Sequence, residues 1–429
     1  MSKGSIIKRE GKDGATSWLL KYDADRHPIT GARQQRYKTV RGTKKAAETE
    51  LRRLLSEVDK GTHVDPAKTT LAQWSAQWLQ GLQVLEKVSV RTYEGYAGWI
   101  NGQIIPTLGA VELQKLTPSH IDALYAKLLT SGHRGSTAKN DKTVRGLSPQ
   151  SVLHIHRTLF QCLKAAVKKR MLARNPAEDA EAPKHKRTRN HGASETSTGS
   201  VKALDRSQIP ALINVFRGKP LFPLVALGLS TGLRRGEILA LRWSAVDLEK
   251  RTLRVDQVIE ITRSLGVRIK ADAKNESSRR TIKIDAGLCD LLRAHRTEQK
   301  SLALKLGVSY PADCLLFPCV IKRPKGRQPQ HGLIAADVDF NRPWDPEAVS
   351  KEFIRGAKAA GLAGFTLHGL RHTHATQLLL EGVPLHSVAQ RLGHSTPVIT
   401  MTTYAHVIQR AEDRAADVAG DLMREALAV

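Results

Sequence analysis

Residues 231–241 read Thr-Gly-Leu-Arg-Arg-Gly-Glu-Ile-Leu-Ala-Leu. Arg234 and Glu237 stand three positions apart in this stretch, a spacing that brings two side chains to the same face of an α-helix. An Arg-x-x-Glu pair of this kind is usually a surface ion pair. It gains a second interpretation from the patches that follow it in the sequence.

The next patch, residues 367–372, reads Leu-His-Gly-Leu-Arg-His and repeats the spacing of three between His368 and Arg371. Such a pair most often lies on a solvated helix face. His368 and His372 also have a spacing that two metal ligands on a helix can have, but no cysteine or carboxylate nearby completes a site. The sequence therefore predicts no metal at this patch.

Three more residues complete the set. Leu-Gly-His at 392–394 provides His394, Tyr404 follows ten residues later, and Lys274 lies upstream in the polar stretch 271–278. A single tyrosine is usually a core residue, and this chain has seven. The order of the five elements is far more specific than any one of them.

The order Arg, Lys, His-x-x-Arg, Gly-His and Tyr resembles the signature of the tyrosine recombinase, or phage integrase, family of the three-domain, arm-binding type. Four sequence segments also resemble that family closely: TGLRRGEILALRW, LHGLRHTHAT, RLGHS and TYAH. The resemblance covers the whole chain. It implies an arm-type DNA-binding domain at 1–62, a helical core-binding domain at 69–182 and a catalytic domain at 201–429. Residues 183–200 have no apolar periodicity and are expected to form a basic interdomain linker.

The patterns along the chain predict a multidomain α+β fold. A small sheet plus a helix comes first, an all-helical domain follows, and a mainly helical domain with a small antiparallel sheet comes last. Helices are expected at 44–60, 70–82, 89–104, 117–129, 148–172, 367–380, 385–392 and after Tyr404. Strands are expected at 5–9, 17–22, 34–40, 251–261 and 279–284.

Breaking a DNA phosphodiester requires a nucleophile, charge stabilisation on the phosphate and a proton for the leaving 5′ oxygen. The resemblance implies that Tyr404 is the nucleophile and forms a 3′-phosphotyrosyl link, so that rejoining needs no ATP. The other implied roles are phosphate binding by Arg234 and Arg371, hydrogen bonding and proton transfer by His368 and His394, general acid catalysis by Lys274, and orientation of neighbours by Glu237. Side-chain cations replace metal ions here, so no metal or other cofactor is expected.

The lysine is the position where the chain departs from the family. Family members often read Pro-Lys-Thr where this chain has Ala-Lys-Asn at 273–275. Lys270 lies four residues earlier and is a rival for the same role. The distance from Lys274 to the Ser-Arg-Arg stretch at 278–280 fits the family better and favours Lys274.

The positive charge of the chain indicates a polyanionic binding partner. Its 429 residues include 68 Lys and Arg against 41 Asp and Glu, a formal net charge of +27. Hydrophobic residues make up 41%, which excludes wholesale disorder. The excess is spread over the chain, and residues 1–62 alone hold 15 basic and 8 acidic side chains. This distribution favours a protein that wraps double-stranded DNA over one with a single membrane anchor.

The remaining composition suggests a cytoplasmic, DNA-associated protein without a membrane span. The N-terminus is too polar for a signal peptide, and the best apolar run, 221–229, is far short of the ~20 residues that cross a bilayer. No C-x-x-C spacing occurs among the four cysteines, which fits a reducing compartment. They are Cys162, Cys289, Cys314 and Cys319.

Two basic segments are candidates for DNA contact. Arg33, Arg36 and Lys38 alternate along an expected strand, so they project from one face or its edge and could enter a groove. The linker begins with the basic residues Lys184, Lys186, Arg187 and Arg189. The linker is either a solvated tether or an arm along DNA, and the sequence does not decide between them.

The family resemblance implies a homotetramer on two duplexes that integrates and excises a phage or mobile element, with an excisionase and a DNA-bending host factor as accessory partners. The C-terminal stripe at 408–427 packs either on its own core or on a neighbouring subunit. Rival interpretations are a type IB topoisomerase-like enzyme that relaxes DNA, a non-enzymatic DNA-binding architectural protein, and a metal nuclease using His368 and His372.

Overall fold

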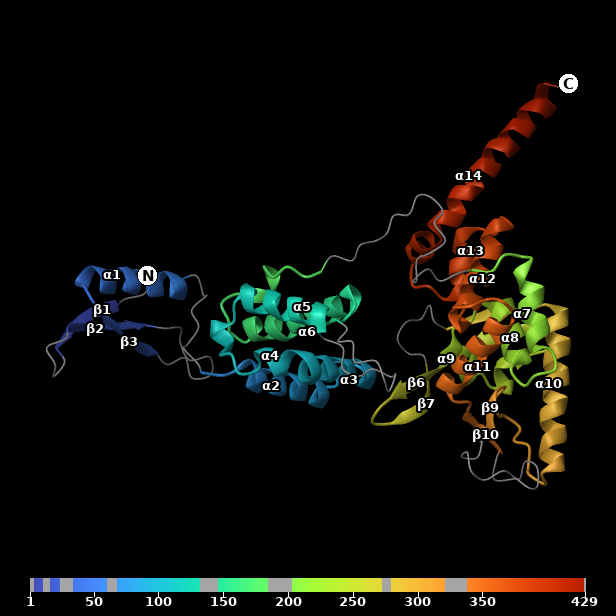
Figure 1. The fold of residues 1–429 in the computed structure, drawn as a ribbon, viewed down its shortest axis with the longest axis horizontal. Helices are drawn as coiled ribbons and strands as arrows, with labels where there is room; N and C mark the ends of the chain where they lie inside the picture. The colour runs from blue at the N-terminus through green and yellow to red at the C-terminus, as the bar shows by residue number, and fades with distance from the viewer. Residues whose placement is uncertain are drawn as a thin grey trace. The chain divides into compact units, whose positions relative to one another are not determined.

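The computed structural model in Figure 1 describes residues 4–10, 16–23, 34–59, 68–131, 146–183, 203–271, 279–320 and 338–427. In the last helix, the side chains at 406–419 and at 422 lie outside this description. The chain divides into two compact units, Met1–Asn190 and His191–Val429. Each unit buries hydrophobic clusters of its own.

The first unit begins with an antiparallel sheet of three strands covered by one helix. The strands in sheet order are β1 (Gly4–Glu10), β2 (Thr16–Asp23) and β3 (Gln35–Arg41), and helix α1 (Lys44–Asp59) follows. Apolar residues at helical spacing, among them Leu51 and Leu54, turn one face of α1 onto Leu20 and Tyr22 of β2. The predicted sheet-plus-helix fold is thus confirmed.

The described remainder of the first unit is mainly helical, with a core around Trp74 and Ile155. Its helices are α2 (Leu71–Val84), α3 (Val90–Trp99), α4 (Ile105–Leu108), α5 (Pro118–Ser131) and α6 (Pro149–Lys168), with 3-10 turns at Leu113–Lys115 and Pro176–Glu178. Polar caps begin three of the helices, because the side chains of Thr70, Ser89 and Ser148 accept a hydrogen bond from a backbone N–H of the first turn.

Two helix boundaries in this unit differ from the expectation. The helix expected at 89–104 changes to a π-helical turn, Ile100–Ile104, just before Pro106, which has no N–H to donate to a regular α-helical bond. Helix α6 ends at Lys168, not near residue 172, because Arg170 has a left-handed backbone with φ of 56°. A non-glycine residue in this conformation leaves little signal in the sequence.

The second unit is mainly helical with small antiparallel sheets. Its helices are α7 (Gln208–Phe216), α8 (Phe222–Thr231), α9 (Arg235–Ala240), α10 (Ala286–Lys305), α11 (Pro346–Ala359), α12 (Leu367–Leu380), α13 (Leu385–Leu392) and α14 (Pro397–Leu427), with a 3-10 turn at Trp243–Ala245. Its strands are β4 (Val246–Asp247), β5 (Thr252–Val255), β6 (Gln257–Thr262), β7 (Gly266–Ala271), β8 (Arg280–Lys283), β9 (Pro318–Val320) and β10 (Val338–Pro343).

The expected strand at 251–261 is two strands that belong to different sheets. Strand β5 pairs with β4 and β8, whereas β6 forms a hairpin with β7. Both halves alternate in polarity, so the sequence pattern carries no mark of the break at Asp256. One small sheet was expected in this unit, but its described strands form three separate small sheets, β4-β5-β8, β6-β7 and β9-β10.

Helix α12 is the element that organises this unit. It packs against α8, α11, α13 and α14, and it coincides with the predicted range 367–380. Helix α14 begins at Pro397, before Tyr404 and not after it. Tyr404 itself has a non-helical backbone, with φ −112° and ψ 19°, which kinks α14 at that residue. In the described part of the chain, no helix has the length and apolar character needed to cross a membrane.

Candidate active site

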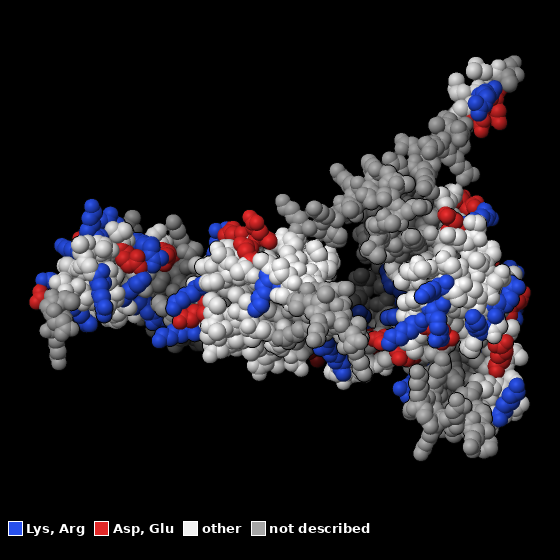
Figure 2. Space-filling view, in the orientation of Figure 1, with Lys and Arg blue, Asp and Glu red and all other residues white. Residues whose placement is uncertain are grey.

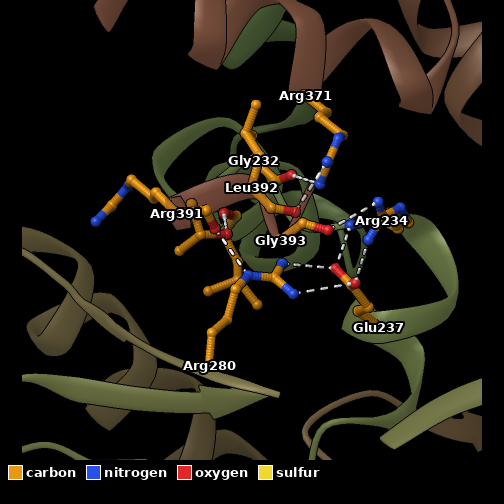
Figure 3. A network of polar contacts seen from close by, with 10 residues as sticks. Gly232, Arg234, Glu237, Arg280, Arg371, Arg391, Leu392 and Gly393 are labelled. Carbon is orange, nitrogen blue, oxygen red and sulfur yellow. Dashed lines mark hydrogen bonds and ion pairs between the residues drawn. The ribbon is translucent and has the colours of Figure 1, made fainter. Parts of the chain in front are cut away.

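Two left-handed glycines create the anchor for Arg371. Helices α8 and α13 end at Gly232 and Gly393, whose φ angles are 66° and 69°. The carbonyl groups at these two helix ends point toward α12. Arg371 donates from Nη1 to the Gly232 carbonyl at 2.9 Å and from Nη2 to the Leu392 carbonyl at 2.8 Å (Figure 3). Because both anchors are neutral, the guanidinium keeps its charge available for an anion.

No side chain fits at either glycine. A Cβ at Gly232 would lie 2.7 Å from the His374 ring, and one at Gly393 would lie 2.7 Å from the Arg280 guanidinium. The positive φ angles add strain for any residue with a Cβ. The glycines of the segments Thr-Gly-Leu-Arg and Leu-Gly-His are thus explained by two helix ends that pack closely, Gly232 against His374 and Gly393 against Arg280.

Arg234 and Glu237 form a helix cap and not a pair on a helix face, which corrects the sequence interpretation. Arg234 precedes α9, with φ −70° and ψ 147°, and its backbone N–H donates to Glu237 Oε2 at 2.8 Å. Its Nη1 donates to Glu237 Oε1 at 2.9 Å. The Glu237 carboxylate is therefore held across the first turn of α9.

Arg280 is a third arginine of the cluster, and sequence reasoning gave it no role. It lies on β8 and donates to both carboxylate oxygens of Glu237, at 2.9 and 3.2 Å, and from Nε to the Arg391 carbonyl at 2.8 Å (Figure 3). The exposed fraction is 5% for the Arg280 side chain and 1% for that of Glu237. One buried carboxylate thus connects α9 to β8.

The cluster carries an excess of positive charge. Burial raises the pKa of the Glu237 carboxyl, but the hydrogen bonds and charge of Arg280, together with Arg234, hold that pKa below its ordinary value. Burial and the neighbouring charge of Arg234 lower the pKa of Arg371 to about 10, which still leaves it protonated at neutral pH. Three arginines around one carboxylate make this region a site for an anion such as phosphate.

Tyr404 lies next to this cluster, and its hydroxyl is within hydrogen-bond distance of a histidine. The tyrosine is 2% exposed, and its hydroxyl lies 3.0 Å from Nδ1 of His372. The ring of His368 meets the ring of His372 edge-on, with 4.7 Å between their centroids. Burial raises the pKa of Tyr404 to about 12, and the charge of Arg371 acts against this shift. The phenol is therefore protonated at neutral pH.

Burial favours the neutral form of both His394 and His368. Burial and the charges of Arg371, Arg234 and Arg280 lower the pKa of His394 to about 4, and burial with Arg371 lowers the pKa of His368. Nδ1 of His394 lies 2.7 Å from the Thr400 hydroxyl. When Nδ1 accepts the hydroxyl proton, Nε2 of the neutral ring carries the hydrogen and is a donor for a phosphate oxygen.

The structure brings most of the predicted site residues together. Helix α12 supplies His368 and Arg371, the segment around α9 supplies Arg234 and Glu237, and the end of α13 with α14 supplies His394 and Tyr404. Nη2 of Arg234 lies 3.4 Å from the carbonyl of Gly393, the residue before His394. Lys274 lies outside the described residues.

Lys270, the rival to Lys274, has an acidic partner. Its ammonium lies 3.6 Å from Glu260 Oε1, across the β6–β7 hairpin. Glu260 also accepts a hydrogen bond from Nε of Arg268 at 2.9 Å. The hairpin packs on α9, where a Cβ at Gly236 would come within 3.0 Å of Val258.

His372 and Arg391 are two further residues of this site for which the sequence predicted no role in recombination. Arg391 donates to His374, to the Ser230 carbonyl and to the Lys283 carbonyl, and thereby fastens α13 to α12, α8 and β8. Within the described ranges, no three His, Cys, Asp or Glu side chains gather in a way that could hold a metal ion. His368 and His372 contact each other through their rings.

The predicted DNA-contact residues of the first unit lie on the helix-covered face of its sheet. Arg36 and Lys38 stand opposite Tyr22 and Leu20 in the β2–β3 register, and Lys38 bonds Glu50 of α1 at 2.6 Å. Paired residues share a face, so the uncovered face instead carries Arg9, Lys21, Tyr37 and Arg41. Arg33 and the linker residues Lys184, Lys186, Arg187 and Arg189 lie outside the described residues.

Figure 2 shows Lys and Arg side chains over the described surface of both units. The basic character of the chain is therefore not confined to the arginine cluster, which agrees with a long polyanionic partner.

Two family models match the chain. The phage integrase family matches residues 202–410, and the N-terminal SAM-like domain of phage integrases matches residues 70–129. Together they cover well over half of the chain. The first range holds every residue of the arginine cluster as well as Tyr404, and the second lies within the helical part of the first unit.

Curated relatives and solved structures agree with the family models. A tyrosine recombinase XerC-like protein of Caldanaerobacter subterraneus is 28% identical over 89% of this chain and 90% of its own length. The ICEBs1 integrase of Bacillus subtilis is 24% identical over 92% of this chain and 95% of its own length. The fold resembles the Tn1549 transposon integrase in complex with a circular intermediate DNA, with a TM-score of 0.57 at 17% identity over 81% of this chain and 99% of that one.

A lambda integrase tetramer bound to a Holliday junction matches with a TM-score of 0.50 at 17% identity, over 92% of this chain and 94% of that one. Family models, relatives and folds thus agree with the site geometry, and the chain belongs to the phage integrase family of tyrosine recombinases, enzymes that cleave and rejoin DNA.

Proposed function

We propose that this protein is a site-specific recombinase that integrates and excises a phage or mobile element by cutting and rejoining double-stranded DNA through a 3′-phosphotyrosyl intermediate. The observation that carries the proposal is the buried tyrosine hydroxyl beside a cluster of three arginines, of which Arg234 and Arg280 share the Glu237 carboxylate and Arg371 is held by two backbone carbonyls. A nucleophile next to a preformed anion site is what phosphoryl transfer without a metal requires.

The phosphate is held by Arg371 and Arg234 through its non-bridging oxygens. Support comes from the anchoring of Arg371 by two carbonyls, which fixes its fork before DNA arrives. Glu237 orients Arg234 through both its backbone and its side chain. Because these groups are already in place, the site reorganises little as charge develops in the transition state.

Tyr404 attacks the phosphorus, the bond to the 5′ oxygen breaks, and a 5′ hydroxyl is released. His394 and His368 donate hydrogen bonds to the phosphate, which their neutral state at pH 7 allows. Lys274 gives its proton to the 5′ oxygen. Rejoining runs the same steps backward with a 5′ hydroxyl of the partner strand.

The proposed partners are core-type and arm-type DNA sites, further copies of this chain in a tetramer, an excisionase and a DNA-bending host factor. The Tn1549 integrase in complex with a circular intermediate DNA supports DNA as a partner, and the lambda integrase tetramer bound to a Holliday junction supports the tetramer. The last turns of α14 support docking on a neighbouring subunit, since Met423 and Leu427 are 60% and 79% exposed. The four cysteines are free thiols, which suits action on DNA in the cytoplasm.

The proposed domains keep the ranges 1–62 for arm sites, 69–182 for core sites, 183–200 for the linker and 201–429 for catalysis. Separate hydrophobic clusters around Leu20, around Trp74 and around Phe353 support this division.

Trapping on a nicked core-site duplex tests the function. The wild-type chain should form a protein–DNA adduct that survives SDS, and Tyr404→Phe should bind the same duplex without forming one. An adduct in the Phe variant would overturn the role of Tyr404. Two marked plasmid sites then distinguish the enzymes, because a recombinase exchanges them whereas a topoisomerase only relaxes supercoils.

A further inference from the structure

His372 contacts the hydroxyl of Tyr404. Its Nδ1 lies 3.0 Å from that hydroxyl, and the two ring centroids are 5.6 Å apart. His372 lies on α12, directly after Arg371 in the chain, while Tyr404 lies at the kink of α14. An imidazole nitrogen thus lies at hydrogen-bond distance from the phenol oxygen, and the phosphate-binding Arg371 is near enough for its charge to influence the same phenol.

The phenol needs a proton acceptor that is inside the site. Burial raises the pKa of Tyr404 to about 12, and the residue is only 2% exposed, so bulk water has little access to it. A phenol that attacks phosphorus must lose its proton during the step. A neutral imidazole has one ring nitrogen that can accept a proton, and Nδ1 of His372 lies at hydrogen-bond distance from the phenol oxygen.

The two histidines assigned to the phosphate are engaged elsewhere. Nδ1 of His394 meets the Thr400 hydroxyl at 2.7 Å. His368 is exposed, and the contact that it makes near the phenol is with the ring of His372. Among the groups that face His372 are His368 on its own helix, Tyr404 on α14 and His394 after α13, and Arg371 precedes it in the chain.

We propose that His372 is the general base of this recombinase and accepts the Tyr404 proton at Nδ1 as the phenol oxygen bonds to phosphorus. The bond from phosphorus to the 5′ oxygen breaks in the same step, and that oxygen takes a proton from the general acid. In rejoining, the 5′ hydroxyl attacks, and His372 returns the proton to the departing tyrosine. The inference rests on the proposed function of Tyr404 as the nucleophile.

An asparagine at 372 separates proton transfer from positioning. In His372→Asn the side-chain amide offers a hydrogen-bonding atom at the place of Nδ1 but cannot take up a proton. Single-turnover cleavage of a core site should fall by about 100-fold or more, with core-site binding unchanged. His386→Asn, at an exposed position on α13, is the matched control and should cleave like the wild type.

A more acidic phenol should bypass the base. Fluorinated tyrosine incorporated at position 404 needs less help in losing its proton, so it should restore most of the cleavage lost in His372→Asn. It should not restore cleavage in Arg371→Lys, whose defect concerns the phosphate. Cleavage by His372→Asn within a few-fold of the wild type, or equal gains from fluorotyrosine in the wild type and in His372→Asn, would overturn the inference.

A second measurement uses the chain without any change at 372. A substrate with sulfur in place of the 5′ bridging oxygen needs no proton on its leaving group, so the proton of Tyr404 is the one that the cleavage step still transfers. Cleavage of this substrate should still be slower in D₂O than in H₂O, and equal rates would refute base catalysis. The outcome for His372 is separate from the outcome for the proposed function. If the His372→Asn and isotope experiments give the contrary results but Tyr404→Phe forms no adduct, His372 is not the base and Tyr404 remains the nucleophile.

Discussion

The guanidinium of Arg280 donates to both carboxylate oxygens of Glu237, at 2.9 and 3.2 Å, and both side chains are almost fully buried. This pair joins strand β8 to the first turn of α9. Glu237 also bonds Arg234 of the proposed phosphate site. The position of Arg234 therefore depends on that of β8.

Removing Arg280 should destabilise the protein strongly. Arg280→Met leaves the Glu237 carboxylate buried with one cationic partner fewer, and the free energy of unfolding should fall by about 3–5 kcal/mol. Urea denaturation measures this loss. Arg254→Met on strand β5 is the control, because the Arg254 side chain is 59% exposed and its pair with Asp256 should contribute less than about 1 kcal/mol.

The pair itself is isolated by a double-mutant cycle. Combining Arg280→Met with Glu237→Gln removes the uncompensated charge, so the double variant should be more stable than the sum of the single losses predicts. Strictly additive losses would mean that Arg280 and Glu237 do not act as a pair.

Arg371→Lys should abolish most cleavage while leaving DNA binding nearly intact. Lysine cannot reach both the Gly232 and the Leu392 carbonyls and still present a planar fork to phosphate. The expected loss is about 3–4 kcal/mol of transition-state stabilisation, measured as the single-turnover cleavage rate. Arg206→Lys, on a side chain that is 83% exposed, should cleave normally. Near wild-type cleavage by Arg371→Lys would contradict the argument from the bidentate fork.

Acid should destabilise the second unit through His374. Burial and the charge of Arg391, which donates a hydrogen bond to Nε2, lower the pKa of His374 to about 4, and the hydrogen bond between Nδ1 and the Leu229 carbonyl acts against this shift. The unfolded chain binds this proton at an ordinary pKa of 6.5, so the stabilisation is complete above pH 6.5 and is lost as the pH falls toward 4.

The size of this contribution is about 3 kcal/mol at neutral pH. The free energy of unfolding should therefore fall more steeply between pH 7 and pH 4 in the wild type than in His374→Gln, because the glutamine at position 374 does not titrate. His394 titrates in both proteins and cancels in the difference. Parallel pH profiles would assign the acid sensitivity to other groups.

The sequence predicted the elements of the site better than their contacts. Helical periodicity reproduced α12 with His368 and Arg371 in place. The spacing of Arg234 and Glu237 was misread, because a separation of three describes both a helix face and the relation of an N-cap to the third helical residue. Only the left-handed backbone at Gly232 shows that α8 ends there and that a new helix follows.

The residues that sequence reasoning missed act through partners far along the chain. Arg280 meets Glu237 across 43 positions, and His372 meets Tyr404 across 32. No periodicity connects positions so distant, since their proximity follows from how α9, β8, α12 and α14 pack. The kink at Tyr404 could not be predicted either, because threonines and alanine around it fit a continuous helix.

A sulfur substitution should distinguish the two lysines. The 5′ bridging sulfur leaves without a proton, so it should rescue Lys274→Ala but not Arg234→Ala, whose defect is on the phosphate. Lys270→Ala should cleave the ordinary substrate almost normally, since the ammonium of Lys270 pairs with Glu260 at 3.6 Å. Rescue of a defective Lys270→Ala by sulfur would transfer the general acid role to Lys270.

The two faces of the N-terminal sheet should differ in DNA binding. The uncovered face carries Arg9, Lys21 and Arg41, whereas Lys38 is engaged with Glu50 of α1. In the full-length chain, replacing Arg9, Lys21 and Arg41 by alanine should remove protection of sequences that flank the crossover site. Core-site cleavage should persist, because the second unit contains the arginine cluster and Tyr404.

A matched charge change separates a specific surface from a general electrostatic anchor. Replacing the exposed α1 residues Lys44, Lys45 and Arg52 by alanine removes the same three charges from the helix. If the sheet face reads DNA sequence, only the sheet variant should lose the flanking footprints at physiological salt. Equal losses in the two variants, together with uniform coating of random DNA by the wild type, would mean that residues 1–62 act through charge alone.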